Sequence, residues 1–154
     1  MVRLTSMSAE DYLPFMENLL RGYAASHVRA GRWTAEESLT EARKETEKLL
    51  PAGRESPGHY FFTILSDPPE EKVGALWLAI EPRGGFIYDL MVFEPFRRRG
   101  YAEAAMRRLE DVAREKGADK LSLHVFGDNA GARRLYQKLG YAETNVILSK
   151  PLAH

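Results

Sequence analysis

The stretch that most limits what this chain can fold into lies between residues 85 and 126. It begins with a run rich in β-branched and aromatic residues, GFIYDLMVFE, and ends with the alternating run KLSLHVF. Between them lies a long segment whose apolar residues recur every three or four positions. These patterns predict a strand, a helix and a second strand. Strands joined through a helix lie parallel in one sheet, so the chain is predicted to contain a βαβ unit.

The predicted helix of this unit follows Arg99 and ends at Gly117. Its apolar residues fall on one face, and charged residues fill the other, which is typical of a helix packed on a sheet. The apolar stripe consists of Ala102, Ala105, Met106, Leu109, Val112 and Ala113.

The part of the chain before this unit predicts a short strand and then two helices. Residues 2–6 alternate as a strand. Ser8 can cap the first helix, which Gly31 ends, and Thr34 can cap the second, which Pro51 ends. Side-chain oxygens at such positions accept bonds from the first helical N–H groups, so these boundaries follow from residue type.

The remaining segments complete a mixed sheet. Residues 60–65 and 73–81 read as strands, and the turn PRGG joins the second of these to the strand of the βαβ unit as an antiparallel hairpin. After the unit, residues 129–140 predict a helix and residues 141–150 a final strand. We therefore expect one α/β (α+β) domain over residues 1–154, with a mostly antiparallel sheet flanked by helices.

Composition excludes several classes of protein. The chain has no cysteine, which rules out disulfides, thiolate metal sites and a cysteine nucleophile. The first residues lack the apolar core of a signal peptide, and no apolar run approaches the roughly 18 residues of a membrane span. A cytoplasmic protein without a membrane partner is expected.

The charges are balanced overall but divided along the chain. Lys plus Arg and Asp plus Glu are both 22, which argues against a nucleic-acid partner. Residues 1–94 hold 10 basic and 15 acidic residues, whereas residues 95–140 hold 11 basic and 6 acidic. This division fits either an anion held by the second part and a cation by the first, or chance variation of surface charge.

Three arginines, Arg97 to Arg99, precede the long helix. The positive end of a helix dipole disfavours cations there, so the stretch is either a solvated basic patch or a site for an anion. Gly100 permits close approach of a ligand to the backbone, and Ala102 is small enough for the same approach. A helix start of this kind is suited to phosphate groups.

The run RRRGYA, residues 97–102, resembles the pyrophosphate loop Q/R-x-x-G-x-G/A of the GNAT family of N-acetyltransferases. The preceding DLMVFEP and the later LSLHVFGDNAGARRLYQKLGYAET are similar to that family's other cofactor segments, so the match runs from about Tyr88 to Thr144. The resemblance implies a GNAT-type fold. Within it, residues 1–85 would shape the acceptor site, and residues 86–145 would form the acetyl-CoA-binding core.

The resemblance implies an acetyl-CoA-dependent N-acetyltransferase that acts directly on a primary amine of a small molecule or peptide, without a metal. A non-catalytic acyl-CoA or coenzyme A sensor on the same fold is the alternative, and the family also allows a homodimer. The residues implied in binding acetyl-CoA are Leu90, Met91, Val92, Arg97, Arg98, Arg99, Gly100, Tyr101, Ala102, Glu103, Asn129 and Tyr136.

The resemblance also implies catalytic roles. Tyr136 is the expected general acid, and Asn129 shares its helix face. His124 is the candidate base, because it breaks an apolar strand where some members of the family carry a glutamate. Asp89 is the alternative base and Glu81 a further rival, and some relatives need no base at all.

Three aromatic residues lie outside this core. His27 and Trp33 either line the acceptor cleft or, in the case of Trp33, pack between two helices. His59 follows a Pro-Gly pair and is expected in a loop.

Overall fold

The computed structural model describes residues 1–153 and divides into two compact units, residues 1–124 and the residues from 125 onward, which are described separately. The first unit contains β1 (Val2–Ser6), α1 (Ala9–Arg29), α2 (Ser38–Leu49), the short 3₁₀ helix η1 (Gly53–Glu55), β2 (His59–Ser66), β3 (Glu71–Glu81), β4 (Gly84–Val92), η2 (Glu94–Phe96), α3 (Tyr101–Glu115) and β5 (Leu121–Leu123). The second contains α4 (Ala130–Lys138).

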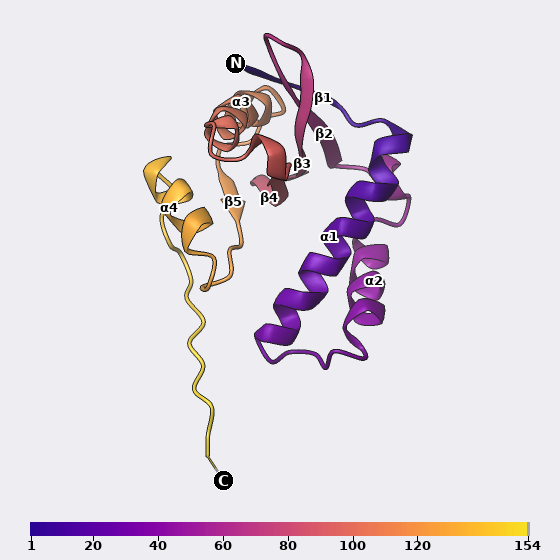
Figure 1. The fold of residues 1–154 in the computed structure, drawn as a ribbon, viewed down its shortest axis with the longest axis vertical. Helices are drawn as coiled ribbons and strands as arrows, with labels where there is room; N and C mark the ends of the chain where they lie inside the picture. The colour runs from indigo at the N-terminus through magenta and orange to yellow at the C-terminus, as the bar shows by residue number, and fades with distance from the viewer. Residues whose placement is uncertain (154) are drawn as a thin grey trace. The chain divides into compact units, whose positions relative to one another are not determined.

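The sheet of the first unit has the order β1-β2-β3-β4-β5 (Figure 1). Strands β1 to β4 pair antiparallel, and β4 pairs parallel with β5 through Gly85–Ile87 against Leu121–Leu123. The predicted mixed sheet and its βαβ unit are therefore confirmed.

Helices cover both faces of this sheet. Figure 1 shows α1 and α2 on one side, here called the α1 face, and α3 on the other, the α3 face. On the α1 face, Phe15 and Met16 of α1 pack with Phe61 of β2 and Trp77 of β3. On the α3 face, Ala105 of α3 packs in a second cluster with residues of β2 and β3. The sheet is therefore the centre of a three-layer arrangement.

The predicted start of α1 is confirmed by its cap, whereas α2 begins at Ser38, later than the start predicted after Thr34. The Ser8 hydroxyl accepts a 3.1 Å bond from the Asp11 N–H at the start of α1. Thr34 and Glu37 bond each other's backbone N–H groups reciprocally, at 3.3 and 3.0 Å, which is the capping-box arrangement. The regular part of α2 begins at Ser38, one turn after this cap.

The apolar stripe predicted for α3 packs as expected, with Ala105, Met106, Leu109 and Ala113 buried. We expect Leu109→Ala, which removes a side chain with 0% exposure, to lower the free energy of unfolding. The loss should be about 2–5 kcal/mol, from lost transfer energy and the cavity left behind. Leu13→Ala is the matched control, since Leu13 is 68% exposed. Urea denaturation that gave equal losses for both would contradict this packing.

Two strands differ from their predicted extents. The strand expected over residues 120–126 is confined to Leu121–Leu123. The final strand predicted over residues 141–150 is absent: within the described chain, residues 141–153 form neither helix nor strand. A strand is defined by its neighbour's hydrogen bonds, so an apolar alternating sequence alone does not create one.

In the second unit, the predicted helix at residues 129–140 is confirmed as α4. Among residues 1–153, no helix combines the length and apolar character needed to cross a bilayer.

Candidate active site

The turn between β4 and α3 has a backbone that leaves the helix start bare. Gly100 occupies the N-cap position with a φ of 84°, and Arg98 has a φ of 64°. No side chain caps the helix, and its first N–H groups have no partner within the helix. The arginine-rich turn thus presents backbone donors at the positive end of the α3 dipole, a geometry suited to phosphate oxygens.

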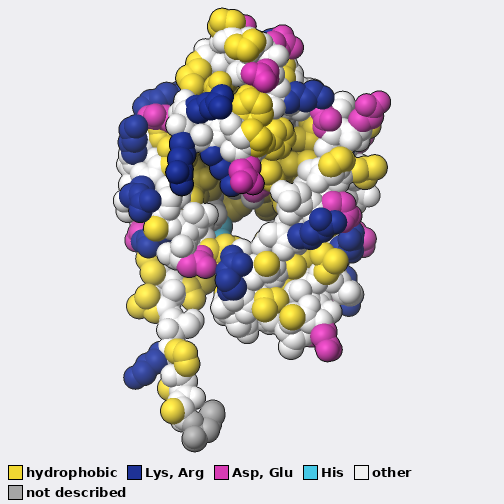
Figure 2. All heavy atoms as spheres, viewed as in Figure 1, with side chains coloured by type: hydrophobic (Ala, Val, Ile, Leu, Met, Phe, Trp, Pro, Cys, Tyr) yellow, Lys and Arg dark blue, Asp and Glu magenta, His cyan; other side chains and the backbone are white. Residues whose placement is uncertain are grey.

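The three arginines of this turn are exposed and only partly engaged. Arg97 Nε donates a 2.9 Å bond to the Val92 carbonyl oxygen at the end of β4. The Arg99 guanidinium lies 5.8 Å from the centre of the Phe96 ring. Neither Arg98 nor Arg99 forms an ion pair among the described residues. Figure 2 shows dark-blue Lys and Arg side chains over the region of α3.

Other residues implied at this helix start have structural contacts. Tyr101 packs at the margin of the α3-face cluster, 6.5 Å from the Phe96 ring centre. Glu103 bonds Arg107 at 3.2 Å, one turn along α3. Ala102 is half-buried. Since these side chains have structural contacts, the backbone N–H groups without a partner in the helix are the distinctive feature of the turn.

The edge of β4 beyond its pairing with β5 is the second feature of the site. The parallel pairing ends at Ile87, but β4 continues to Val92. The Met91 carbonyl oxygen faces β3, 2.2 Å from where a Cβ on Gly74 would lie. Because peptide groups alternate in direction along a strand, those of Leu90 and Val92 point to the opposite edge of β4, where the pairing with β5 has already ended.

A β-bulge in β4 brings Asp89 to the α1 face. The register shifts between Trp77 and Leu78, so that Asp89 faces Trp77 and Tyr88 is the additional residue. The Tyr88 ring stacks on Trp77, with centroids 4.5 Å apart. Cross-strand partners share a face, so the Asp89 side chain lies on the side of the sheet that α1 covers.

Asp89 carries a buried carboxyl oxygen that no group satisfies. The residue as a whole is half-buried, but Oδ2 is buried and lacks a hydrogen-bond partner among the described residues. Burial raises the pKa of the carboxyl from 3.8 to about 6, and the Leu90 backbone acts in the opposite direction. Such unpaired buried groups are costly, and shifted pKa values cluster at functional sites.

His124 lies just past β5 and is exposed. Ser122 pairs with Phe86, whose ring contacts Tyr88, so alternation also places His124 on the α1 face. The pKa of His27, near the end of α1, is lowered by burial, then by Arg32, and to a smaller extent by His124. His27 and His124 therefore lie within electrostatic reach of each other.

His27 belongs to an aromatic group at the end of α1. Its ring centre is 4.4 Å from that of Tyr23 and 4.6 Å from that of Trp33. Trp33 packs beside Leu20, Ala24 and Ala42, which join α1 to α2. Packing between helices, one of the two readings of Trp33, is therefore what the structure shows.

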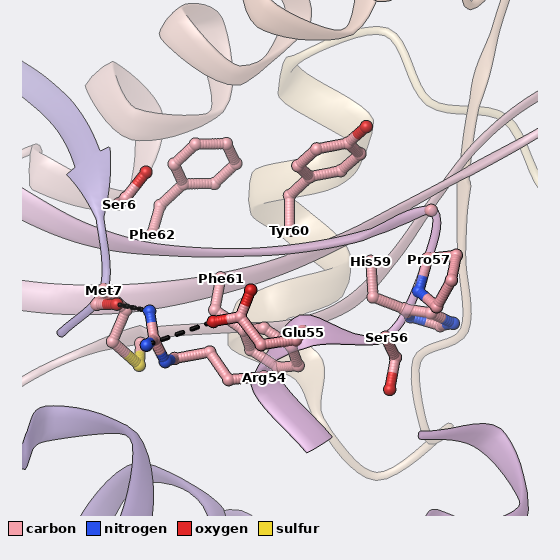
Figure 3. A pocket seen from close by; sticks show the side chains of 11 residues that line it. Ser6, Met7, Arg54, Glu55, Ser56, Pro57, His59, Tyr60, Phe61 and Phe62 are labelled. Atoms are coloured by element: carbon pink, nitrogen blue, oxygen red, sulfur yellow. Dashed lines mark hydrogen bonds and ion pairs between the residues drawn. The ribbon is translucent and has the colours of Figure 1, made fainter. Parts of the chain in front are cut away.

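His59 was expected in a loop but is the first residue of β2. Its Nδ1 accepts a 3.1 Å bond from Trp77 Nε1, and burial lowers the pKa of its imidazole. The Pro-Gly pair before it suggested a loop, although the run HYFFTIL is continuous with a strand. His59 also lines a cleft of about 360 Å³, where Arg54 bonds the Met7 carbonyl and pairs with Glu55 (Figure 3).

A second cleft, of about 410 Å³, lies between α1 and the end of β4. Asn18 of α1 and Met91 of β4 both line it, and Asn18 Nδ2 approaches Met91 Sδ at 3.5 Å. Glu94 and Arg97 line it as well. The cleft thus reaches the strand end at which the candidate site is built. Glu81, the further rival base, is exposed at the end of β3.

Asn129 and Tyr136 belong to the second unit. Asn129 is the N-cap of α4, and its side-chain oxygen accepts a 3.2 Å bond from the Ala132 N–H. Tyr136 is half-buried on α4, with its ring centre 6.0 Å from that of Tyr141. The two predicted residues thus lie on or at the start of one short helix.

Comparisons with known proteins agree with this geometry. The model of the acetyltransferase (GNAT) family matches residues 20–141. The chain is 38% identical to the uncharacterized N-acetyltransferase YdgE of Bacillus subtilis (strain 168), with 97% of each chain covered. It is 37% identical to YycN of the same organism, an uncharacterized N-acetyltransferase, with 98% of this chain and 99% of YycN covered.

Solved structures share the fold. The crystal structure of YycN matches with a TM-score of 0.94 at 37% identity over 100% of both chains. PaiA N-acetyltransferase of Thermoplasma acidophilum, solved in complex with coenzyme A, matches with a TM-score of 0.67 at 18% identity, covering 96% of this chain and 93% of that one. The chain belongs to the GNAT family of acetyltransferases.

Proposed function

We propose that the protein transfers an acetyl group from acetyl-CoA directly to a primary amine of a small molecule or peptide. The observation that carries this proposal is the open edge of β4 beside the bare start of α3. An extended pantetheine needs backbone partners such as Leu90 and Val92, and a pyrophosphate needs donors such as the amides after Gly100. The bond from Arg97 to Val92 ties the two features together.

The residues present fit acetyl-CoA as co-substrate. Leu90 and the N–H of Val92, whose carbonyl oxygen already accepts a bond from Arg97, would pair with its pantetheine. The amides that follow Gly100, with Arg98 and Arg99, would hold its diphosphate. Guanidinium groups form strong charge-assisted bonds to phosphate. Acetyl-CoA supplies an activated acetyl group as a thioester, and coenzyme A leaves with its sulfur protonated.

A cationic amine first releases one proton to solvent and becomes a nucleophile. Two further protons then move in the reaction, and the chain offers a group for each. The acceptor nitrogen loses a proton as its bond to the acetyl carbon forms, and the sulfur gains one as its bond to that carbon breaks. We assign the first proton to Asp89, whose carboxylate is available above a pKa of about 6. His124, on the same face of the sheet, is the alternative base. Tyr136 is the proposed donor of the second proton.

The acceptor is assigned to the α1 face, where Asp89 and His124 both lie. Two carboxylates, Asp11 and Glu94, and two cations, Lys72 and Arg97, line the 410 Å³ cleft on this face, so its charges balance. The carboxyl oxygen of Asp89 that lacks a partner is the group on this face that can accept a bond from an amine N–H. A primary amine is therefore the acceptor class that we assign to this face.

A screen of amines tests the proposal. Purified protein is supplied with acetyl-CoA and each of a set of polyamines, amino acids, aminoglycosides and peptides, and thiol release is measured. At least one amine should give release above the amine-free rate, with one acetyl group added to the acceptor by mass spectrometry. Acetyl bound covalently to the protein during turnover would contradict direct transfer.

The pyrophosphate site gives a separate prediction. Gly100→Val forces a β-branched residue into a left-handed conformation, which costs about 1–2 kcal/mol, and the turn should shift to relieve it. We expect affinity for coenzyme A to fall by about 10-fold or more in titration calorimetry.

Gly117→Val is the matched control, because Gly117 has a φ of 91° just beyond the other end of α3. Both substitutions should lower stability by a similar amount, and only Gly100→Val should weaken coenzyme A binding. Equal affinities for the two variants would remove the diphosphate from this turn.

A further inference from the structure

Three aromatic side chains stack in a row across neighbouring strands on the α1 face. Phe61 of β2 stacks on Trp77 of β3, with ring centres 5.2 Å apart and ring planes inclined by 29°. Trp77 stacks in turn on Tyr88 of β4, at 4.5 Å and 23°. These spacings are close to the roughly 4.8 Å between paired strands, so the rings follow the sheet. Phe61, Trp77 and Tyr88 are here called the aromatic row.

The aromatic row is buried at one end and open at the other. Phe61 and Trp77 are 5% and 2% exposed, and the Trp77 indole is fixed by its 3.1 Å bond to His59. Tyr88 is half-buried, and Phe86 meets its ring edge to face at 4.8 Å. Among the described residues, Tyr88 stacks on no ring other than Trp77. The row therefore ends in a held ring with one face left for a further stacking partner.

The open end of the row lies at the candidate active site. The parallel pairing of β4 with β5 ends at Ile87 and Leu123, so no paired strand supplies a side chain beside Tyr88. Asp89 follows Tyr88 in the bulge and carries the carboxyl oxygen without a partner. Consecutive residues of a strand are about 3.3 Å apart, so a ring stacked on Tyr88 and an amine bonded to Asp89 are separated by only a few covalent bonds.

The side chains around this end of the row are aromatic and uncharged at neutral pH. Burial lowers the pKa of the His59 imidazole and raises that of the Tyr88 phenol, and Glu81 is the second cause acting on both pKa values, which it raises. Binding sites of this composition, with flat apolar walls and one placed polar group, suit a ligand with an apolar body and a single polar end. They suit a polyamine or a sugar less well, because each further charge or hydroxyl would need its own partner.

We propose that the acceptor is a primary amine joined by a short chain, of about two carbons, to an aromatic ring, and that this ring extends the aromatic row by stacking on Tyr88. The inference rests on the proposed function, because it needs the amine at Asp89. Tyr88 is then a residue that determines specificity: it binds the body of the acceptor and takes no part in proton transfer.

The first test compares amines that differ only in the group attached to the same two-carbon chain. Thiol release from acetyl-CoA is measured with 2-phenylethylamine, with 2-cyclohexylethylamine, which is apolar but not aromatic, and with the diamine 1,4-diaminobutane. On the wild-type protein, kcat/KM calculated on the free amine should be about 10-fold or more higher for 2-phenylethylamine than for either of the others. Acetylation of amines without this preference would overturn the inference and leave the proposed function intact. A preference for the diamine would transfer recognition to Glu81. No acetylation of any amine would remove both.

The second test assigns the preference to Tyr88. Tyr88→Leu should raise KM for 2-phenylethylamine about 10-fold, change kcat little and abolish the preference over 2-cyclohexylethylamine, whereas Tyr88→Phe, which keeps the ring, should retain it. Tyr60→Leu is the matched control, because Tyr60 is a half-buried tyrosine whose ring lies 3.9 Å from Lys116 Nζ at the end of α3. An unchanged preference in Tyr88→Leu would overturn the assignment. The comparison of amines on the wild-type protein decides the inference even if Tyr88→Leu does not fold.

Discussion

Asp89→Asn is expected to lower kcat/KM for the acceptor amine at pH 8 by about 10²–10⁴, the usual contribution of a positioned base. The amide keeps the size of the carboxyl but cannot take up a proton. The same substitution should abolish the fall in rate at acidic pH. In the wild-type protein kcat/KM calculated on the free amine should decline tenfold per pH unit below about 6, where Asp89 becomes protonated.

The fall in rate at acidic pH, here called the acidic limb, can be assigned to one residue. The other groups that could cause it either titrate far from pH 6 or can be removed by substitution. A primary amine titrates near ~10, so the titration of the acceptor lies far from that of Asp89. His124→Ala should retain the limb near pH 6, since Asp89 remains. A limb that disappears in His124→Ala and persists in Asp89→Asn would transfer the role of base to His124. An acidic limb that is unchanged in both variants would mean that solvent, and neither residue, accepts the proton.

Measurements of stability distinguish a catalytic Asp89 from an Asp89 whose role is purely structural. Burial disfavours the ionised carboxylate in the folded protein, so between pH 3.8 and about 6 the folded state binds more protons than the unfolded state. The free energy of unfolding therefore falls as pH rises through this window. Asp89→Asn removes that fall and should raise stability at pH 8 by about 1–2 kcal/mol, allowing for partial solvent access. Chemical denaturation at pH 4 and pH 8 measures the difference.

The prediction therefore couples a gain in stability to a loss of activity in one variant. An interior aspartate kept for packing or hydrogen bonding would show a loss of stability on substitution, because a partner would be left unsatisfied. Asp89 has no such partner at Oδ2. A variant that was both less stable and fully active would contradict the catalytic assignment.

Local patterns predicted the fold because its main elements depend on local chemistry. The period of apolar residues in α3, and the caps Ser8 and Thr34, specify helices without knowledge of their partners. The prediction of a final strand was wrong for the opposite reason. Whether residues 141–150 become a strand depends on hydrogen bonds from a neighbouring strand, which local sequence does not specify.

The sequence predicted the part of the candidate site that consists of backbone groups next to a recognisable motif. The arginine turn and Gly100 could be located from the sequence, because a glycine before an amphipathic helix signals a special backbone. The sequence could not distinguish Asp89 from the other carboxylates as the important one. Its importance arises from a bulge at Tyr88, which depends on the register between β3 and β4 and leaves no trace in residue spacing. His59 was missed because a Pro-Gly pair was given more weight than the run that follows it.

Tyr136→Phe is expected to reduce kcat by about 10²–10³ while leaving the affinity for coenzyme A within a factor of about two. The substitution removes one hydroxyl and keeps the ring, so the packing of α4 should persist. A phenol is protonated at neutral pH, with an ordinary pKa near ~10, and can donate its proton as the bond between carbon and sulfur breaks. Without it the sulfur must leave as a thiolate or take its proton from water.

Tyr141→Phe is the matched control, because Tyr141 lies beside Tyr136 in the same unit, with ring centres 6.0 Å apart. It should retain most of the wild-type kcat. Acyl donors whose leaving thiols are more acidic need less protonation, so a donor of that kind should recover much of the activity of Tyr136→Phe and little of that of Asp89→Asn. Since the two protons leave and arrive at different atoms, this selective rescue distinguishes the two roles. Equal rescue of both variants would mean that Tyr136 does not serve the sulfur.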